Sequence, residues 1–261
     1  MERKIRVGAV SYLNTKPLIY GLQQGMMKDA VELIIDYPAN IAAALLNDEI
    51  DIGLVPVAII PEMEKHYIVS DYCISSNGEV ASVCLFSEVP VEEIKVVLLD
   101  YQSRTSVKLV QVLLKEYWKI DPVFEKADIN FRDEIKGTTA AVVIGDRAFE
   151  QRLVSKYRYD LGLAWKDLTG LPFVFATWVS NKPINENFIK DFNSANEYGL
   201  INIDRVVAEN AYPLFDLKKY YTQFIQYRLD TANRKGMKEF LKMISPQPAN
   251  QIPLFKSVQK Q

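Results

Sequence analysis

Residues Val7–Leu18 read V-G-A-V-S-Y-L-N-T-K-P-L, an apolar run that passes through a polar loop into the start of a helix. The run Ile5–Val10 is typical of a buried strand. Thr15 can cap the helix that follows, and Pro17 falls in its first turn, where a missing N–H group breaks no hydrogen bond. A strand followed directly by a helix is the repeating unit of α/β folds, so this stretch predicts that class.

The same alternation continues on the C-terminal side of this stretch. Helices are expected to begin at Pro38 and to span Ser103–Trp118, where apolar residues recur at helical spacing. From Asn187 onward the chain is expected to be helical, including Asp204–Ala211 and Tyr220–Leu229, with a loosely attached tail after Ser245. The expected strands are Val31–Asp36, Ile52–Val55, Tyr67–Ile74, Val80–Phe86, Lys95–Leu99, Pro122–Glu125 and Ala140–Ile144. This spacing predicts a mostly parallel sheet covered on both sides.

Two interruptions divide the pattern into two lobes. Pro90 and three Glu break it at Glu88–Glu93, and Leu171–Val179 is a return segment rich in aromatic and β-branched residues. If both segments cross between lobes, they form a double-crossover hinge with a ligand cleft between two α/β lobes. The expected first lobe then holds residues 1–88 and 180–261, and the second holds residues 89–179. One continuous doubly wound sheet stays open as the alternative.

Composition and charge limit the classes of function. The 261 residues carry 31 Lys and Arg against 33 Asp and Glu, a net charge of −2. This balance speaks against a protein that coats nucleic acid or an anionic membrane. No apolar run reaches the roughly 18 residues of a membrane span, and the N-terminus lacks the apolar core of a signal peptide. We therefore expect a cytoplasmic protein whose partner is a small molecule.

Histidine and cysteine usage excludes further chemistries. His66 is the only histidine, which removes Ser-His-Asp hydrolases and multi-histidine zinc sites. Cys73 and Cys84 lack metal-ligand spacing, and their apolar surroundings predict buried thiols. Neither a Walker loop nor a G-x-G-x-x-G turn is present. The sequence therefore indicates no metal and no nucleotide cofactor.

Polar side chains gather where expected strands end and helices begin, which is where open α/β sheets bind ligands. The first such group is Ser11, Tyr12, Asn14 and Thr15. Asn14 can both donate and accept hydrogen bonds, so it suits a ligand carboxylate or hydroxyl. The alternative is that Asn14 and Thr15 only cap the helix.

The second group is Ser103, Arg104, Thr105 and Ser106, around the first turn of an expected helix. Unpaired N–H groups, the positive end of the helix dipole, three hydroxyls and a guanidinium together make an anion site. Because the glycines of a Walker loop are missing, a carboxylate is favoured over a nucleotide phosphate. The alternative is a helix cap with a solvated Arg104.

Two further turns supply candidate residues. Glu79 and Ser82 follow the turn signal Asn77-Gly78, and Glu79 is a candidate base, although a carboxylate at a strand start is usually solvated. Gly145 ends the expected strand Ala140–Ile144 and would let the backbone approach a ligand closely. Asp146 can bind substrate or cap the next helix.

The motifs at these turns resemble those of the chorismate dehydratases of the futalosine route to menaquinone (the MqnA family). The similar stretches are S-Y-L-N-T-K-P-L, D-I-G-L-V-P, S-V-C-L-F-S, S-R-T-S, V-V-I-G-D-R-A and Y-D-L-G-L-A-W-K-D-L-T-G-L-P-F-V-F-A-T-W. They occur in this order between about residues 5 and 180, which makes the resemblance far more specific than any single motif.

The resemblance implies a two-lobed periplasmic-binding-protein-like fold of the second type. It also implies that chorismate loses water to give 3-[(1-carboxyvinyl)oxy]benzoate, with no metal or cofactor. From the family, Asn14 and Ser82 are carried over as the residues closest to the reacting centre. The base is left open between Glu79 and the enolpyruvyl carboxylate of the substrate, and the uncharged motifs favour the substrate. The competing class is a non-catalytic cytoplasmic solute-binding protein for a small aromatic or dicarboxylate ligand.

Overall fold

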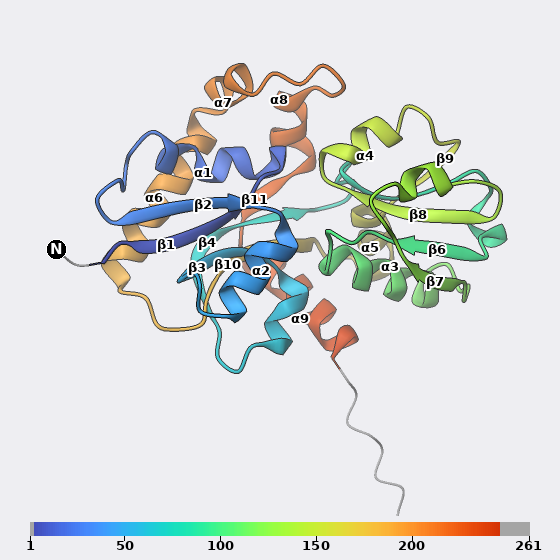
Figure 1. The fold of residues 1–261 in the computed structure, drawn as a ribbon, viewed down its shortest axis with the longest axis horizontal. Coiled ribbons are helices and arrows are strands. Elements are labelled where there is room, and N and C mark those ends of the chain that lie inside the picture. The colour runs from blue at the N-terminus through green and yellow to red at the C-terminus, as the bar shows by residue number, and fades with distance from the viewer. Residues whose placement is uncertain (1–2, 246–261) are drawn as a thin grey trace, which may run out of the picture.

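The computed structural model describes residues 3–245 and has two lobes, each built on its own sheet (Figure 1). The first sheet has six strands in the order β11-β4-β10-β3-β1-β2, and the second has five in the order β7-β6-β8-β5-β9. The strand bounds are β1 Ile5–Val10, β2 Val31–Asp36, β3 Ile52–Pro56, β4 Tyr67–Ser76, β5 Val83–Ser87, β6 Val96–Leu99, β7 Val123–Lys126, β8 Thr139–Ile144, β9 Tyr157–Asp160, β10 Phe173–Ser180 and β11 Gln226–Arg228. The two-lobed α/β fold predicted from the sequence is confirmed.

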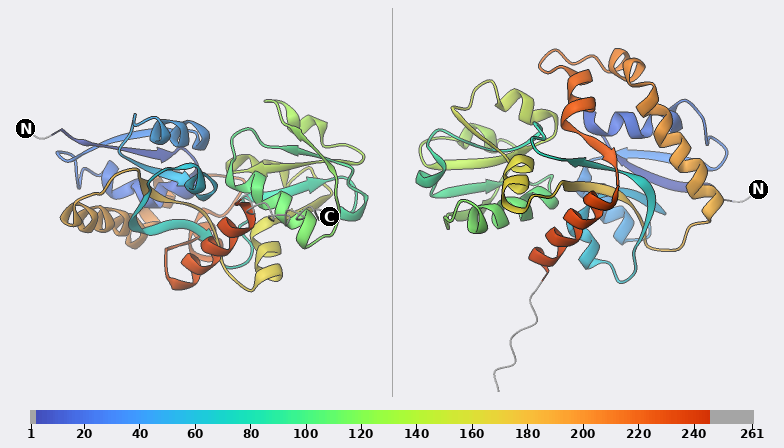
Figure 2. Two further views of the ribbon diagram at one scale, coloured as in Figure 1. Left: turned by 90° about the horizontal axis from the view of Figure 1, so that it is seen from below. Right: turned by 180° about the vertical axis from the view of Figure 1, so that it is seen from behind.

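Helices cover the faces of both sheets, as the two further views show (Figure 2). The α-helices are α1 Lys16–Gln23, α2 Pro38–Leu46, α3 Thr105–Glu116, α4 Asp146–Gln151, α5 Leu161–Thr169, α6 Glu186–Ile201, α7 Ile203–Glu209, α8 Leu217–Lys219 and α9 Thr231–Ile244. In the first lobe α1 packs against α6 and α2 packs against β1 and β3, while α3 packs against α5 in the second. Over residues 3–245, none of these helices combines the length and apolar character needed to cross a membrane.

The prediction of a mostly parallel sheet is wrong, because both sheets are mixed. β1 runs parallel to β2 and β3, and β6 runs parallel to β7 and β8. β10 runs antiparallel to β3 and β4, and β5 runs antiparallel to β8 and β9. The reason is the path between the lobes. The chain enters the second lobe at the start of β5, and this start lies beside the end of β8, since Val83 pairs with Ile144. β5 therefore runs in the opposite direction to β8.

The chain crosses between the sheets at residues 77–82, between β4 and β5, and again between β9 and β10. The first crossing expected at Glu88–Glu93 is therefore wrong: this segment joins β5 to β6 within the second lobe. The second crossing overlaps the expected Leu171–Val179, although β10 itself pairs in the first sheet. We propose lobe boundaries near residues 82 and 172 in place of 88 and 179.

The C-terminal third contains the largest differences in secondary structure. Tyr220–Leu229 was expected to be helical, but Tyr220–Phe224 is a π-helical turn and Gln226–Arg228 is β11, which pairs with the edge of β4. The helical spacing of four aromatic residues, Tyr220, Tyr221, Phe224 and Tyr227, cannot reveal a free strand edge elsewhere in the chain. Pairing with that edge decides the conformation. The expected tail after Ser245 lies outside the described residues.

Candidate functional site

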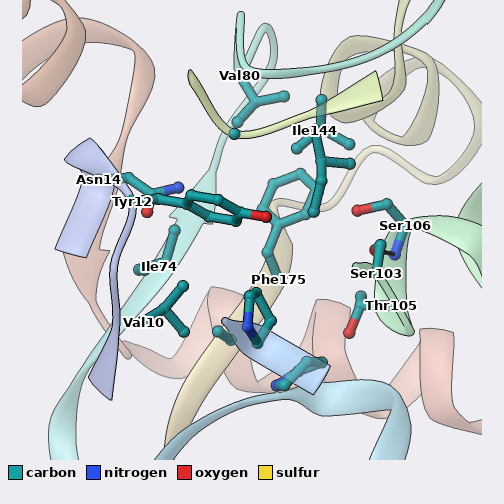
Figure 3. Close-up of a pocket in the computed structure, with 15 residues that line it drawn as sticks. Val10, Tyr12, Asn14, Ile74, Val80, Ser103, Thr105, Ser106, Ile144 and Phe175 are labelled. Atoms are coloured by element: carbon teal, nitrogen blue, oxygen red, sulfur yellow. Dashed lines mark hydrogen bonds between the residues drawn. The ribbon is translucent and has the colours of Figure 1, made fainter. Parts of the chain in front are cut away.

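A cavity lies between the lobes, where the ends of several strands meet. It leaves about 60 Å³ accessible to the centre of a water molecule. Uncharged residues line it throughout the described part of the chain. They are Val10, Tyr12, Asn14, Pro38, Pro56, Ile74, Phe175 and Ala176 from the first lobe, and Val80, Val83, Ser103, Thr105, Ser106, Ile144 and Gly145 from the crossing segment and the second lobe. Apolar side chains form most of the wall, and polar groups face each other from two sides (Figure 3).

Tyr12 extends across the cavity from the loop after β1 toward the second lobe (Figure 3). Its hydroxyl donates a hydrogen bond to Oε1 of Gln102, at 2.5 Å. The ring lies against Gly145, where an added Cβ would sit 3.0 Å from three ring atoms. Gly145 also has φ 64° and ψ −149°, a backbone conformation that only glycine adopts readily. The prediction at Gly145 was a close approach to a ligand; in this structure the group that lies close to Gly145 is the ring of Tyr12.

The first turn of α3 forms the polar wall opposite Asn14. Ser103 Oγ accepts a hydrogen bond from the Ser106 N–H at 3.0 Å, and Thr105 Oγ1 accepts one from Ala58 N–H of the first lobe at 3.2 Å. All three hydroxyl side chains of this turn line the cavity. The hydroxyls and the positive end of the helix dipole together favour an anionic group at this wall.

Arg104 does not join this wall. Its guanidinium forms an ion pair with Glu62, at 3.0 Å between Nη1 and Oε2, and both side chains are substantially exposed. Arg104 is also absent from the residues that line the cavity. The structure therefore brings the hydroxyls of the S-R-T-S motif to the cavity and leaves its guanidinium at the surface, between the lobes.

Asn14 lines the cavity, and its backbone carbonyl accepts a hydrogen bond from the Tyr227 hydroxyl at 3.0 Å. Thr15 is buried beside it, and its hydroxyl lies 3.4 Å from Asn14 Oδ1. The Thr15 side chain makes no capping bond to α1, so the predicted cap is not formed. Ser11 does not line the cavity, and its N–H donates to the Asp36 carbonyl.

Ser82 is fully buried at the start of β5 and does not itself line the cavity, whereas Val80 and Val83 on either side of it do. The Tyr220 hydroxyl donates a hydrogen bond to Ser82 Oγ at 2.6 Å. The Ser82 carbonyl accepts one from Gly145 N–H at 2.9 Å. Ser82 is thus fixed to both lobes.

Glu79 lies outside the cavity. Its side chain is 42% exposed, and Oε1 forms an ion pair with Arg152 Nη2 at 3.1 Å. A candidate base must come within hydrogen-bond reach of the proton that it removes. In this conformation Glu79 does not, which weighs against its predicted role as base.

Asp146 bonds the lobes to each other. Its Oδ1 accepts a hydrogen bond from Leu13 N–H of the first lobe at 3.1 Å, and its carbonyl accepts one from the Tyr212 hydroxyl at 3.2 Å. Burial raises the pKa of Asp146 to about 6, against the lowering effects of the Leu13 N–H and Lys16. Asp146 does not line the cavity, so its position indicates a contact between lobes rather than the predicted substrate contact.

Two residues at the site have no counterpart among those singled out from the sequence. Gln102 directly precedes the S-R-T-S motif and is held by buried Asp100, which accepts its N–H at 3.0 Å and pairs with Arg147 at 2.7 Å. Its place in a loop after a strand was a usable signal. The second residue is Tyr220, and no local signal places it beside Ser82, because 138 residues separate them.

No cluster of His, Cys, Asp or Glu suited to a metal ion is found within residues 3–245. Cys73 and Cys84 are buried free thiols, as predicted. The exposed His66 stands outside the cavity. The site therefore consists of hydroxyls, an amide, backbone N–H groups and an apolar wall.

Two α/β lobes that enclose a polar-and-apolar cavity and are joined by two crossings define the periplasmic-binding-protein-like class. A protein from Archaeoglobus fulgidus superposes with a TM-score of 0.72 at 13% identity, covering 92% of this chain and 96% of that one. A Candida albicans protein described as exhibiting the generic periplasmic binding protein fold superposes with a TM-score of 0.66 at 14% identity, covering 93% and 90%. These likenesses confirm the fold.

The sequence matches the profile of the menaquinone biosynthesis family over residues 5–246, and the chain belongs to this family. A chorismate dehydratase of Thermus thermophilus is 26% identical over 259 residues, covering 90% of this chain and 93% of the relative. A chorismate dehydratase of Campylobacter jejuni is 25% identical over 246 residues, covering 90% and 95%. The resemblance stated from the motifs is confirmed.

Proposed function

We propose that this chain is a chorismate dehydratase, a carbon–oxygen hydro-lyase that converts chorismate to 3-[(1-carboxyvinyl)oxy]benzoate in menaquinone biosynthesis. The observation that carries the proposal is the meeting of the similar motifs at one cavity. Tyr12 and Asn14 come from the first motif, Ser103, Thr105 and Ser106 from the fourth and Gly145 from the fifth, and all six contribute to the cavity wall. The family and the two relatives support the same conclusion.

The reaction needs little from the protein beyond binding and orientation. The proton leaves C3 of the ring, the hydroxyl leaves C4 as water, and the ring becomes aromatic, which supplies a large driving force. An enzyme that holds reacting groups in a productive geometry can lower the barrier by roughly 7–11 kcal/mol. An uncharged, largely apolar cavity suits this task, because it excludes water while a few polar groups fix the orientation.

The two carboxylates of chorismate require hydrogen-bond donors. The first turn of α3 supplies hydroxyls and the positive end of the helix dipole for one carboxylate. The apolar side chains Val10, Ile74 and Phe175 form the wall against which the ring would pack (Figure 3). Asn14, on the opposite side, is then placed at the reacting part of the ring.

The enolpyruvyl carboxylate of the substrate is the base that the geometry supports best. Among residues 3–245 no Asp or Glu lines the cavity, and Glu79 is paired with Arg152 outside it. A substrate carboxylate held near C3 needs no side-chain base. The protein then contributes by orienting that carboxylate and by donating hydrogen bonds to the departing C4 hydroxyl, from Asn14, which lines the cavity, and from Ser82, which the family resemblance assigns to the reacting centre.

The test is incubation of the purified protein with chorismate while ultraviolet absorbance and mass spectrometry follow the aromatic ether. A chelator is added, because the site offers no metal ligands, and turnover should persist. A sample without protein and one with Asn14→Ala correct for spontaneous decay of chorismate. Binding of chorismate with no turnover above these controls would contradict the proposal and favour a solute-binding protein.

A further inference from the structure

Ser82 follows a strained turn at the crossing between the lobes. Ala81 is fully buried and has φ 64°, a left-handed conformation that a residue with a Cβ rarely adopts. Such conformations persist only where the surrounding structure holds them, and they cluster at functional sites. The turn therefore needs groups that fix it in place.

The second lobe supplies those groups. The Asp160 carboxylate accepts hydrogen bonds from Val80 N–H at 3.0 Å and from Ala81 N–H at 2.7 Å. Arg152 Nη1 donates to the Ala81 carbonyl at 3.1 Å. Groups of the second lobe thus fix the backbone that precedes Ser82. They do not fix the direction in which the Ser82 hydroxyl points its hydrogen.

Tyr220 of the first lobe contacts that hydroxyl directly. Its O–H donates to Ser82 Oγ at 2.6 Å, and both side chains are almost wholly buried. Burial raises the pKa of Tyr220. Tyr220 therefore stays protonated and contacts Ser82, one of the two residues that the family resemblance places at the reacting centre. It also belongs to a π-helical turn, a feature frequent at functional sites.

We propose that Tyr220 is a positioning residue whose O–H, by donating to Ser82 Oγ, leaves the single hydrogen of Ser82 free for the substrate. A serine hydroxyl has one hydrogen and two lone pairs. When Tyr220 donates to one lone pair, the Ser82 hydrogen must point elsewhere, and under the proposed function its acceptor is the departing C4 hydroxyl. This inference rests on the proposed function.

The alternative is that Tyr220 only packs in the core. Its ring makes edge contacts with Phe149 and Phe215, at centroid distances of 5.1 and 5.9 Å. Tyr220→Phe keeps these ring contacts and removes only the hydroxyl. Tyr221→Phe is the matched control, since Tyr221 is the next residue, is equally buried, and has a hydroxyl with no hydrogen-bond partner among the described residues.

The experiment compares steady-state kinetics of Tyr220→Phe, Tyr221→Phe, Ser82→Ala and the double variant Tyr220→Phe/Ser82→Ala, after thermal melts have confirmed folding. We expect Tyr220→Phe to lower kcat by about 10- to 100-fold, since misplacing a reacting group by about 1 Å can have an effect of that size. KM should change little, and Tyr221→Phe should match the wild type. On the Ser82→Ala background, Tyr220→Phe should lower kcat no further, because it acts through Ser82.

Either of two results would overturn this inference and leave the proposed function standing. In the first, Tyr220→Phe has the same kcat as Tyr221→Phe. In the second, the losses of kcat in Tyr220→Phe and Ser82→Ala multiply in the double variant. Multiplied losses would mean that Tyr220 acts independently of Ser82. A wild-type protein that leaves chorismate unchanged would overturn the proposed function itself. Turnover by the wild type is therefore measured before any variant is compared.

Discussion

Hydroxyl and amide side chains supply the polar groups of the cavity, and they must hold a dianionic substrate without a charged partner. Asn14, Ser103, Thr105 and Ser106 are the polar side chains in the wall besides Tyr12. Hydrogen bonds from neutral donors to a carboxylate are roughly twice as strong as those between two neutral groups. Each such bond also lowers the pKa of the carboxylate that accepts it, so a substrate carboxylate that acts as the base must accept few of them.

Glu79→Gln tests that assignment of the base. It keeps the side-chain shape and removes the charge, and we expect kcat to fall less than about tenfold, because Glu79 is paired with Arg152 outside the cavity. Asn14→Ala and Ser82→Ala should each lower kcat by about 100-fold or more, since they disturb groups at the reacting centre. A general base is worth about 10²–10⁴-fold. A loss of about a thousandfold in a folded Glu79→Gln protein would make Glu79 the base.

Arg104 provides a second test at this scale. If it bound a substrate carboxylate, Arg104→Ala would raise KM far more than Glu62→Gln. The exposed Arg104–Glu62 pair predicts instead that both variants have similar, small effects, because an exposed ion pair contributes at most about 1 kcal/mol, or roughly fivefold in KM. Steady-state KM values for the two variants decide between these outcomes. An increase of more than about tenfold for Arg104→Ala alone would return Arg104 to the binding site.

The polar side chains of the cavity wall, and Gly145, could be predicted because they follow buried strands directly. Tyr12, Asn14, Ser103, Thr105, Ser106 and Gly145 all stand at such positions and all line the cavity. The direction of a long side chain was not predictable in the same way. Arg104 and Glu79 have charged partners outside the cavity, Glu62 and Arg152, that lie 42 and 73 residues away in the chain. Such pairs depend on how the lobes meet.

At the level of the elements, the junction of β8 and α4 requires a glycine at position 145, because of its backbone conformation and the nearby Tyr12 ring. We expect Gly145→Ala to lower the melting temperature and to raise KM, because a Cβ would strain the backbone by about 1–3 kcal/mol and press on the Tyr12 ring. Gly170→Ala is the control. Gly170 has φ 72° but open space around it, so this variant should lose about 1–2 kcal/mol of stability without a change in KM. Equal KM values for the two variants would contradict a role for the ring contact.

Elements with strong local patterns were predictable, and those made by distant partners were not. β1 and β2 have the predicted bounds, and α2 begins at Pro38 as predicted. β9 and α5 were missed, although Asp160 caps α5 through the N–H groups of Gly162 and Leu163, and Gly170 ends it in a left-handed conformation. Those are recognisable helix signals. β11 offers no such signal, because only the free edge of β4 makes it a strand.

In the whole molecule, contacts across the cleft hold the lobes closed around the cavity. They include Tyr12 with Gln102, Leu13 N–H with Asp146, and Ala58 N–H with Thr105. The small cavity implies that substrate enters when these contacts part. The equilibrium between open and closed lobes then contributes to the apparent affinity.

Asp146 makes that equilibrium depend on pH. In the closed form burial raises its pKa to about 6, whereas in open lobes a hydrated carboxyl would return toward its ordinary value of 3.8. Asp146 therefore binds its proton more tightly in the closed form than in the open form. Closure of the lobes is disfavoured at pH values above the raised pKa of Asp146, and it becomes more favourable as the pH falls through that pKa. We expect KM for chorismate to fall as pH is lowered from about 8 to about 6.

Asp146→Asn keeps an acceptor for the Leu13 N–H and removes the ionisation, so its KM should vary less with pH over the same range. Profiles of KM against pH for the two proteins measure the effect. A wild-type KM that rises as pH falls, or identical profiles for both proteins, would contradict this account of closure.

The position of Tyr220 and Tyr227, far along the chain from their partners Ser82 and Asn14, sets the time at which the site can form during synthesis. The Asn14 carbonyl receives its hydrogen bond from Tyr227, 213 residues later. Ribosomes add about 5–20 residues per second, so roughly 10–40 s pass between the two residues. Until Tyr220 and Tyr227 have been added, Ser82 and Asn14 lack these partners. A nascent chain that ends before Tyr220 therefore cannot assemble the reacting centre.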